Sequence, residues 1–218
     1  MTPARLLRIC RRAILVWCLL SGAGFFLVRP LAAALLPAMG WMINHMQSDF
    51  RAQLLVEDFK GSPMIMMPCV TTRAIALASG GFAAPDSSFD GGGVDAVHAL
   101  VPIVIFLVAV ISWPVRGWHE MLGRALGSMV LLPPLVAMTT VLLFVGRVEG
   151  LLHRLTTGVA PSQRSALLQS YVFMEEGGRW LVPLVAAMLC IGIGAKLFGR
   201  GRASSPTGAT PEPGLPAP

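Results

Sequence analysis

The sequence predicts an all-α integral membrane protein with four transmembrane helices, both termini in the cytoplasm and a small folded segment outside. Composition is the first reason. Of the 218 residues, 55% are hydrophobic and 13% are charged, against about 25% charged residues in an average soluble domain. The second reason is the mean hydropathy of +0.69, which comes from apolar runs close to the ~20 residues that cross a bilayer core.

The first predicted span covers residues 13–39 and follows a basic N-terminus, residues 1–12. Its apolar core, AILVWCLLSGAGFFLV, comes directly after a pair of arginines. A basic start before an apolar core is also the pattern of a signal peptide. Here Arg29 and Pro30 follow the core, and hydrophobicity resumes through Met46 as an amphipathic stretch that lies along the membrane surface or is tilted into it. We therefore favour an uncleaved anchor, with the arginine side chain reaching the outer interface.

Three further apolar runs complete the four spans, at residues 98–113, 125–146 and 180–198. The middle run of these three has Pro133 and Pro134 at its centre. Prolines inside a transmembrane helix are tolerated where neighbouring helices satisfy the freed carbonyl groups. That helix is therefore expected to be bent and packed against others. Tryptophans at the edges of the runs suit the membrane–water interface.

Basic residues set the predicted orientation. The N-terminus, the loop 114–124 and the C-terminal end from Lys196 hold nine basic residues against two acidic ones. The basic residues are Arg5, Arg8, Arg11, Arg12, Arg116, Arg124, Lys196, Arg200 and Arg202. The positive-inside rule then places both termini in the cytoplasm. The expected location is the inner membrane of a bacterium. The outer loop 147–179 weakens this pattern because it carries four arginines of its own.

The outer segment 40–97 is the place for a small folded unit. AQLLVEDF and MIMMPCVTTRAIAL have β-compatible content and are separated by the turn-like KGSP, which predicts a β-hairpin. ASGGFAAPDSSFDGGG is expected to be a flexible linker back to the second span. In the loop 147–179, two helical patterns around GVAPSQ predict interfacial helices. The tail 199–218 is rich in Pro, Gly, Ser and Thr and is expected to be disordered.

The stretch SPMIMMPCV contains the main candidate metal ligands, the soft side chains of Met64, Met66, Met67 and Cys69. Thioether and thiol groups suit Cu(I), and Met42, His45 and Met46 lie in the same outer segment. However, methionine is a common filler of apolar packing. A strand would also send Met64 and Met66 to one face and Met67 and Cys69 to the other. The pattern favours a strand, with a periplasm-facing copper site as the alternative.

No motif in the chain marks a catalytic or cofactor site. Cys69 with His98 or His153, or Ser128, can be drawn as nucleophiles, but nothing in the local sequence activates them. DGGG at residues 90–93 lacks the lysine and hydroxyl residue of a phosphate-binding loop. The spans hold almost no ionisable residues, which argues against proton-coupled transport. The net charge of +6 is explained by topology, so no nucleic-acid partner is expected.

The most suggestive polar cluster is Glu175, Glu176 and Arg179 in YVFMEEGGRWLVP, at the outer end of the last span. Their spacing of three or four residues allows an ion pair on a helix. This is either a charged helix start with a tryptophan anchor or a docking point for another integral membrane protein.

The order of these segments resembles the small membrane proteins associated with exosortase H, accessory proteins of bacterial envelope systems that process C-terminally tagged exported proteins. The stretches that carry the resemblance are RLLRICRRAILVW, RPLAAALLPAMGWM, VDAVHALVPIVIFLVA, LLPPLVAM and WLVPLVAAM. It covers most of residues 5–200 and lies in the organisation of the chain. It implies a non-enzymatic accessory subunit that meets membrane lipids and another integral membrane protein. The alternatives are a subunit of a conjugative-transfer or secretion machine, a copper-handling protein and, last, an intramembrane hydrolase.

Overall fold

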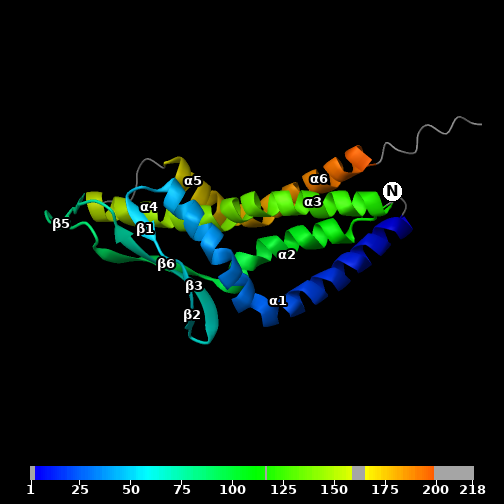
Figure 1. Ribbon diagram of the computed structural model, residues 1–218, viewed down its shortest axis with the longest axis horizontal. Coiled ribbons are helices and arrows are strands. Elements are labelled where there is room, and N and C mark those ends of the chain that lie inside the picture. Colours follow the sequence, from blue (N-terminus) through cyan, green and yellow to red (C-terminus); the bar gives the residue numbers. More distant parts are fainter. Residues whose placement is uncertain (1–2, 116, 159–164, 199–218) are drawn as a thin grey trace, which may run out of the picture.

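The computed structural model describes residues 3–115, 117–158 and 165–198, with a helical body at one end of its long axis and a sheet at the other (Figure 1). The elements in chain order are α1 (Pro3–Met46), β1 (Phe50–Ala52), β2 (Leu55–Phe59), β3 (Ser62–Thr71), β4 (Ile75–Ala76), β5 (Phe82–Ala83), β6 (Ser88–Asp95), α2 (Ala96–Ser112), α3 (Trp118–Val136), η1 (Ala137–Val141), α4 (Leu142–Thr157), α5 (Ala166–Phe173), η2 (Met174–Gly178) and α6 (Arg179–Phe198).

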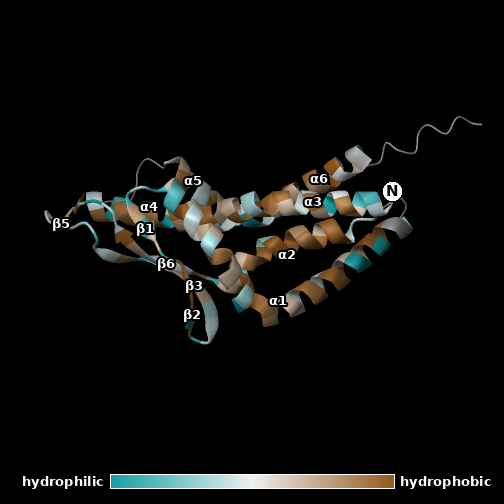
Figure 2. Cartoon of the chain, viewed as in Figure 1, coloured by the Kyte–Doolittle hydropathy of each residue, from teal (hydrophilic) through white to brown (hydrophobic). Residues whose placement is uncertain are grey.

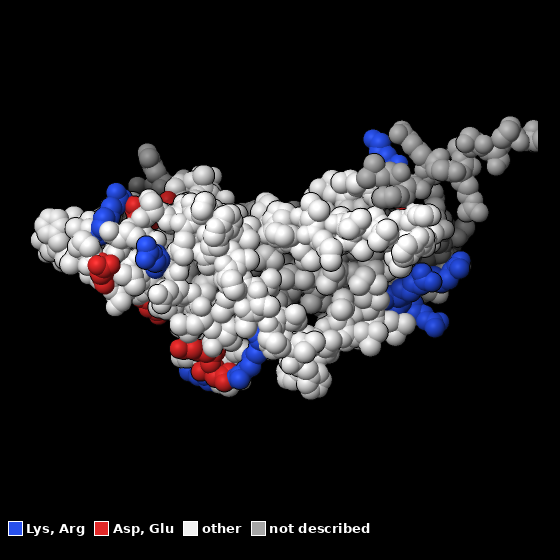
Figure 3. Space-filling view, viewed as in Figure 1, with Lys and Arg blue, Asp and Glu red and all other residues white. Residues whose placement is uncertain are grey.

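Three helical runs in the described residues are long and apolar enough to cross a membrane: Leu6–Met46, Trp118–Thr157 and Ala166–Lys196. Helix α2 is also apolar but has 17 residues, so it is shorter than these. Figure 2 shows that α2, α3 and α6 form a mainly hydrophobic band beside the first part of α1. In Figure 3 the middle of the molecule is almost free of charge, and arginines gather at the end opposite the sheet. These features indicate a multi-pass membrane protein.

Helix α1 differs from the predicted span 13–39, because it continues as one helix to Met46. The helix bends in its middle (Figure 1), and Pro30 lies inside it. Proline lacks the N–H that would bond to the preceding turn, which accounts for a bend there. The second limb is helical because it is amphipathic, and its apolar face is covered by protein. Ala32, Met39 and Ile43 are buried in the main core.

Strand β3 is the centre of the main sheet. Strands β1 and β2 pair with successive parts of one edge, and β6 pairs with the other edge, all antiparallel. The predicted hairpin is confirmed: β2 and β3 are joined at Lys60 and Gly61, whose φ angles of 52° and 83° are those of a two-residue hairpin turn. Strands β4 and β5 form a separate small pair.

The predicted flexible linker, residues 78–93, is instead largely ordered, since it contains β5 and most of β6. The glycines of this segment permit close contact between β6 and β3. A Cβ atom on Gly91 would lie 2.7 Å from the Met67 carbonyl oxygen and 2.9 Å from the Cys69 Sγ atom. Glycine in a strand often marks such a close backbone approach. The glycine run therefore lets β6 pack against β3.

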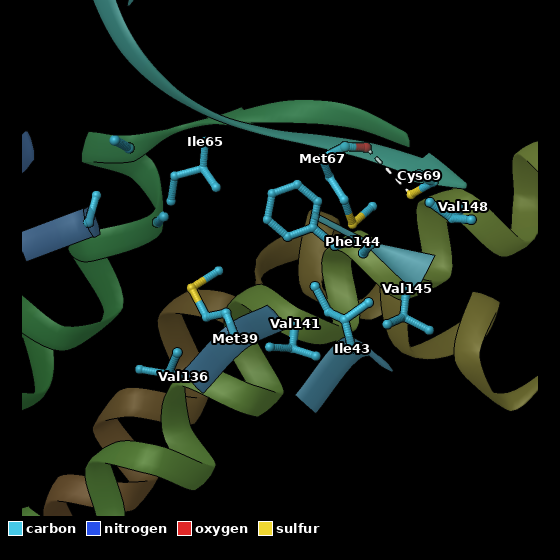
Figure 4. Close-up of a cluster of buried hydrophobic side chains, with 14 of the residues drawn as sticks. Met39, Ile43, Ile65, Met67, Cys69, Val136, Val141, Phe144, Val145 and Val148 are labelled. Atoms are coloured by element: carbon cyan, nitrogen blue, oxygen red, sulfur yellow. Dashed lines mark hydrogen bonds between the residues drawn. The ribbon is translucent and has the colours of Figure 1, made fainter. Parts of the chain in front are cut away.

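Two helices, α4 and α5, lie where the sequence predicts helical patterns in the loop 147–179, and each is continuous with a neighbouring helix. Helix α4 continues α3 through the π-helical turn η1, and α5 leads through the second π-helical turn η2 into α6. Helix α5 packs on α4, and α4 packs on β6 of the sheet. Phe144 and Val148 of α4 pack on the inner face of the sheet, where Met67 of β3 and Ile43 of α1 join them (Figure 4). The sheet and the helix extensions thus form one packed unit outside the apolar band.

Candidate functional site

The four predicted soft ligands lie on two faces of β3. Met67 and Cys69 are fully buried on the inner face, and the Cys69 thiol donates to the Met67 carbonyl at 3.5 Å (Figure 4). Met64 and Met66 lie on the outer face, where both cover Gly93. The structure therefore separates the four side chains into two pairs. Among the described residues, no three His, Cys, Asp or Glu side chains gather as a metal site.

Replacing Met64, Met66 and Met67 with leucine is expected to leave the copper content of the purified protein unchanged. The reason is the division of these side chains between two faces, since a tight Cu(I) site needs its soft ligands around one point. Metal analysis of the wild-type and triple-variant proteins, both loaded with Cu(I) and washed, checks this. A stoichiometric copper ion lost only in the variant would contradict it.

Burial raises the pKa of the Cys69 thiol from 9.0 to about 12, and the Asp90 carboxylate adds to the rise. The thiolate is the nucleophilic form of cysteine, so this environment suppresses its reactivity. Among the described residues, His98 at the start of α2 and His153 near the end of α4 make no hydrogen bond to Cys69. Ser128 is buried in a helix contact, 3.8 Å from the Cys190 Sγ atom, as expected of a packing residue.

We expect Cys69 to resist N-ethylmaleimide at pH 8 in the folded protein. With a pKa of about 12, the thiolate fraction there is on the order of 10⁻⁴. Peptide mass spectrometry after timed labelling measures the reaction, with SDS-denatured protein as the control that should react quickly. Because the fold disfavours the thiolate, its free energy of unfolding should fall as the pH rises from 9 toward 12. Fast labelling of Cys69 in the folded protein would refute the expected resistance to N-ethylmaleimide.

The predicted cluster Glu175, Glu176 and Arg179 is not held together by an ion pair in the described structure. Both glutamates are exposed on η2, and the helix is kinked at Gly177, whose φ is 132°. Arg179 instead turns toward the helical body. Its guanidinium lies 5.7 Å from the centre of the Trp180 ring, in a small recess that is also lined by α2.

A polar pocket of about 410 Å³ lies between β6, α4 and α5. We call it the arginine pocket, and its lining residues are Asp90, Gly91, Gly92, Gly146, Arg147, Gly150, Leu151, Arg154, Leu168 and Tyr171. The Arg147 guanidinium lies over Gly92 and donates to the Gly93 carbonyl at 3.0 Å. Asp90 accepts from the Gly92 amide at 2.7 Å.

Sequence reasoning missed the arginine pocket. The glycines at residues 91–93 were interpreted as part of a linker. Arg147 and Arg154 were interpreted as exceptions to the positive-inside rule. The available signal was the spacing on α4, where Arg147, Gly150 and Arg154 recur at intervals of three and four residues and so share one helix face.

A second missed feature lies at the opposite end of the molecule. Arg124 and Glu120 form a buried ion pair on α3. The same guanidinium donates to the carbonyl oxygens of Trp113 at 2.8 Å and Pro114 at 3.0 Å, at the end of α2. The pair therefore joins the first turns of α3 to the end of α2.

The fold and these sites define a mainly helical, multi-pass membrane protein that carries a small β-sheet outside its apolar band. Comparison of the chain with protein-family models, with curated proteins and with solved structures finds no match.

Proposed function

We propose that this protein is a four-span subunit of the bacterial inner membrane, with both termini in the cytoplasm. We further propose that it is a non-enzymatic accessory subunit of an exosortase-type protein-sorting machine in the envelope. The observation that carries the proposal is the outer face of the sheet. A shallow groove of about 410 Å³ lies there, lined by the apolar residues Leu55, Met66, Pro68 and Phe89 together with Glu57, Ser88 and Asp90. The solvent face of an antiparallel sheet is normally polar, so a groove outside the membrane that combines apolar and acidic side chains supports docking of a partner protein.

Helix α2 supports the count of four spans. Its 17 residues are at the lower end of the range for transmembrane helices. It packs along α1 and α6, and Asp95 caps its first turn by accepting from the amide of Val97 at 2.8 Å. At the other end of α2, the Arg124 side chain donates to the Trp113 carbonyl oxygen. Backbone polar groups at both ends of this short helix therefore have hydrogen-bond partners.

The distribution of charge supports the orientation. The arginine-rich start of α1 lies at the end of the molecule opposite the sheet (Figure 3). Arg29, in the middle of α1, pairs with Asp58 of the β2–β3 hairpin, which suits a residue at the outer interface. A reporter fused after Arg202 tests this, because N-in/C-in topology requires cytoplasmic activity. Activity only in the periplasm would overturn the orientation.

The test of function is to purify the tagged protein from its native membrane in mild detergent and identify co-purifying proteins by mass spectrometry. We expect an integral membrane protease of the exosortase type. Met66→Arg, on the outer sheet face, should lose that protein. Phe82→Arg, at the exposed β5 strand, is the matched control and should retain it. Recovery of a secretion or conjugation subunit instead would favour the alternative machine, and recovery of lipid alone would refute the proposal.

A further inference from the structure

We propose that the arginine pocket binds a carboxylate group of the partner protein outside the membrane, with Arg147 and Arg154 as its ligands. The identity of the partner rests on the proposed function. The preference of the pocket for a carboxylate is independent of the proposed function, because it follows from the side chains of this chain alone.

The pocket is shaped by glycine on both of its walls. On β6, Gly92 has a φ of +93°, and a Cβ atom there would lie 3.1 Å from the Arg147 Cζ atom. The strand also shifts register opposite β3 at this point, and such bulges frequently lie beside functional sites. On α4, Gly150 leaves room between Arg147 and Arg154. Two arginines therefore line an open space on one face of a helix.

The charge of the pocket favours an anion. Arg147 uses one nitrogen on the Gly93 carbonyl, which leaves further N–H groups of its guanidinium for a ligand. Within the described ranges Arg154 forms neither an ion pair nor a side-chain hydrogen bond. Asp90 is the single acidic residue of the lining, and one of its oxygens is held by the Gly92 amide. The lining thus has two positive charges against one negative charge, and guanidinium groups bind carboxylate and phosphate oxygens through paired N–H donors.

The position of the pocket favours a protein carboxylate over a lipid phosphate. Helix α4 extends past the apolar band to the sheet end of the molecule (Figures 1 and 2). Arg154 lies seven residues beyond Arg147, about 10 Å farther along the helix. Asp90 also lines the groove on the outer sheet face, so the two depressions adjoin. A partner segment with an apolar side chain next to a carboxylate would fill both.

The test uses the full-length protein in detergent micelles and an acetylated Ala-Leu dipeptide with either a free or an amidated C-terminus. Binding is followed by saturation-transfer NMR, with inorganic phosphate as a competing probe. The free carboxylate should bind at least about tenfold more tightly than the amide, a factor that corresponds to ~1.4 kcal/mol. Arg154→Gln should remove this difference. Arg73→Gln is the matched control, because Arg73 is an exposed arginine of the same outer unit that pairs with Asp49, and it should preserve the difference.

Equal binding of the two dipeptides, or binding of neither, overturns the proposal. Binding of phosphate but not of the dipeptide, with loss in Arg154→Gln, overturns the carboxylate assignment and identifies a phosphate site. Arg154 makes no side-chain hydrogen bond in the described structure, so Arg154→Gln should keep the wild-type unfolding temperature. Dipeptide binding without any co-purifying membrane protein would leave this inference standing and refute the proposed function alone.

Discussion

Replacing Arg124 with methionine is expected to lower the free energy of unfolding by about 3–5 kcal/mol, the usual cost of breaking a buried ion pair from one side. Arg124 is 3% exposed and Glu120 is 8% exposed, so little water can replace the lost interaction. The variant removes the guanidinium from beside the buried Glu120 side chain. It also removes the donor to the Trp113 and Pro114 carbonyl oxygens.

The size of this effect separates a buried pair from an exposed one. An exposed ion pair contributes about 0–1 kcal/mol, so Arg73→Met, which breaks the exposed pair between Arg73 and Asp49, is the control and should change little. Removing both charges with Glu120→Leu and Arg124→Met should cost less than Arg124→Met alone, because no buried carboxylate then remains. Thermal unfolding in detergent, followed by circular dichroism, measures all three. A double variant that is less stable than the single one would contradict this account.

The sequence predicted best those elements that depend on local composition. The apolar run 98–113 is helical as predicted and lies in α2, Ala96–Ser112, apart from its last residue, and the apolar run 180–198 lies in α6, Arg179–Phe198. An apolar run limits where such a helix begins and ends. The β2–β3 hairpin was also predictable, because a Lys-Gly turn between two β-compatible stretches needs only neighbouring residues.

The elements that were missed depend on contacts between distant residues. Strand β6 resembles a linker in the sequence because its glycines have high local freedom, and only its packing against β3 explains them. Likewise, the second limb of α1 was expected on the membrane surface, since an amphipathic pattern does not say what covers its apolar face. The arginine pocket needs β6, α4 and α5 together, so neither arginine could be assigned to it from its own surroundings in the chain.

Gly146 is the point at which α4 and α5 approach most closely among the glycines of α4. A Cβ atom on Gly146 would lie 2.5 Å from the Tyr171 Cβ atom and 3.0 Å from the Leu167 carbonyl oxygen. Both neighbours are parts of α5 that cannot rotate away, so an added methyl group must move the whole helix. Gly150, one turn later, has its nearest neighbour in the Leu168 Cδ1 atom at 3.4 Å, which is an ordinary contact with a mobile side-chain end.

These two glycines therefore give opposite predictions for the same substitution. Alanine is favoured over glycine within a helix by about 1 kcal/mol, so Gly150→Ala should leave the free energy of unfolding unchanged or raise it by up to ~1 kcal/mol. At Gly146 the same gain is outweighed by overpacking, which typically costs about 1–3 kcal/mol, and Gly146→Ala should be destabilising overall. Because α5 forms one wall of the arginine pocket, Gly146→Ala should also weaken binding of the free-carboxylate dipeptide. Thermal unfolding and NMR titration of both variants test this, and equal stability of the two would show that α4 and α5 are not in close contact at Gly146.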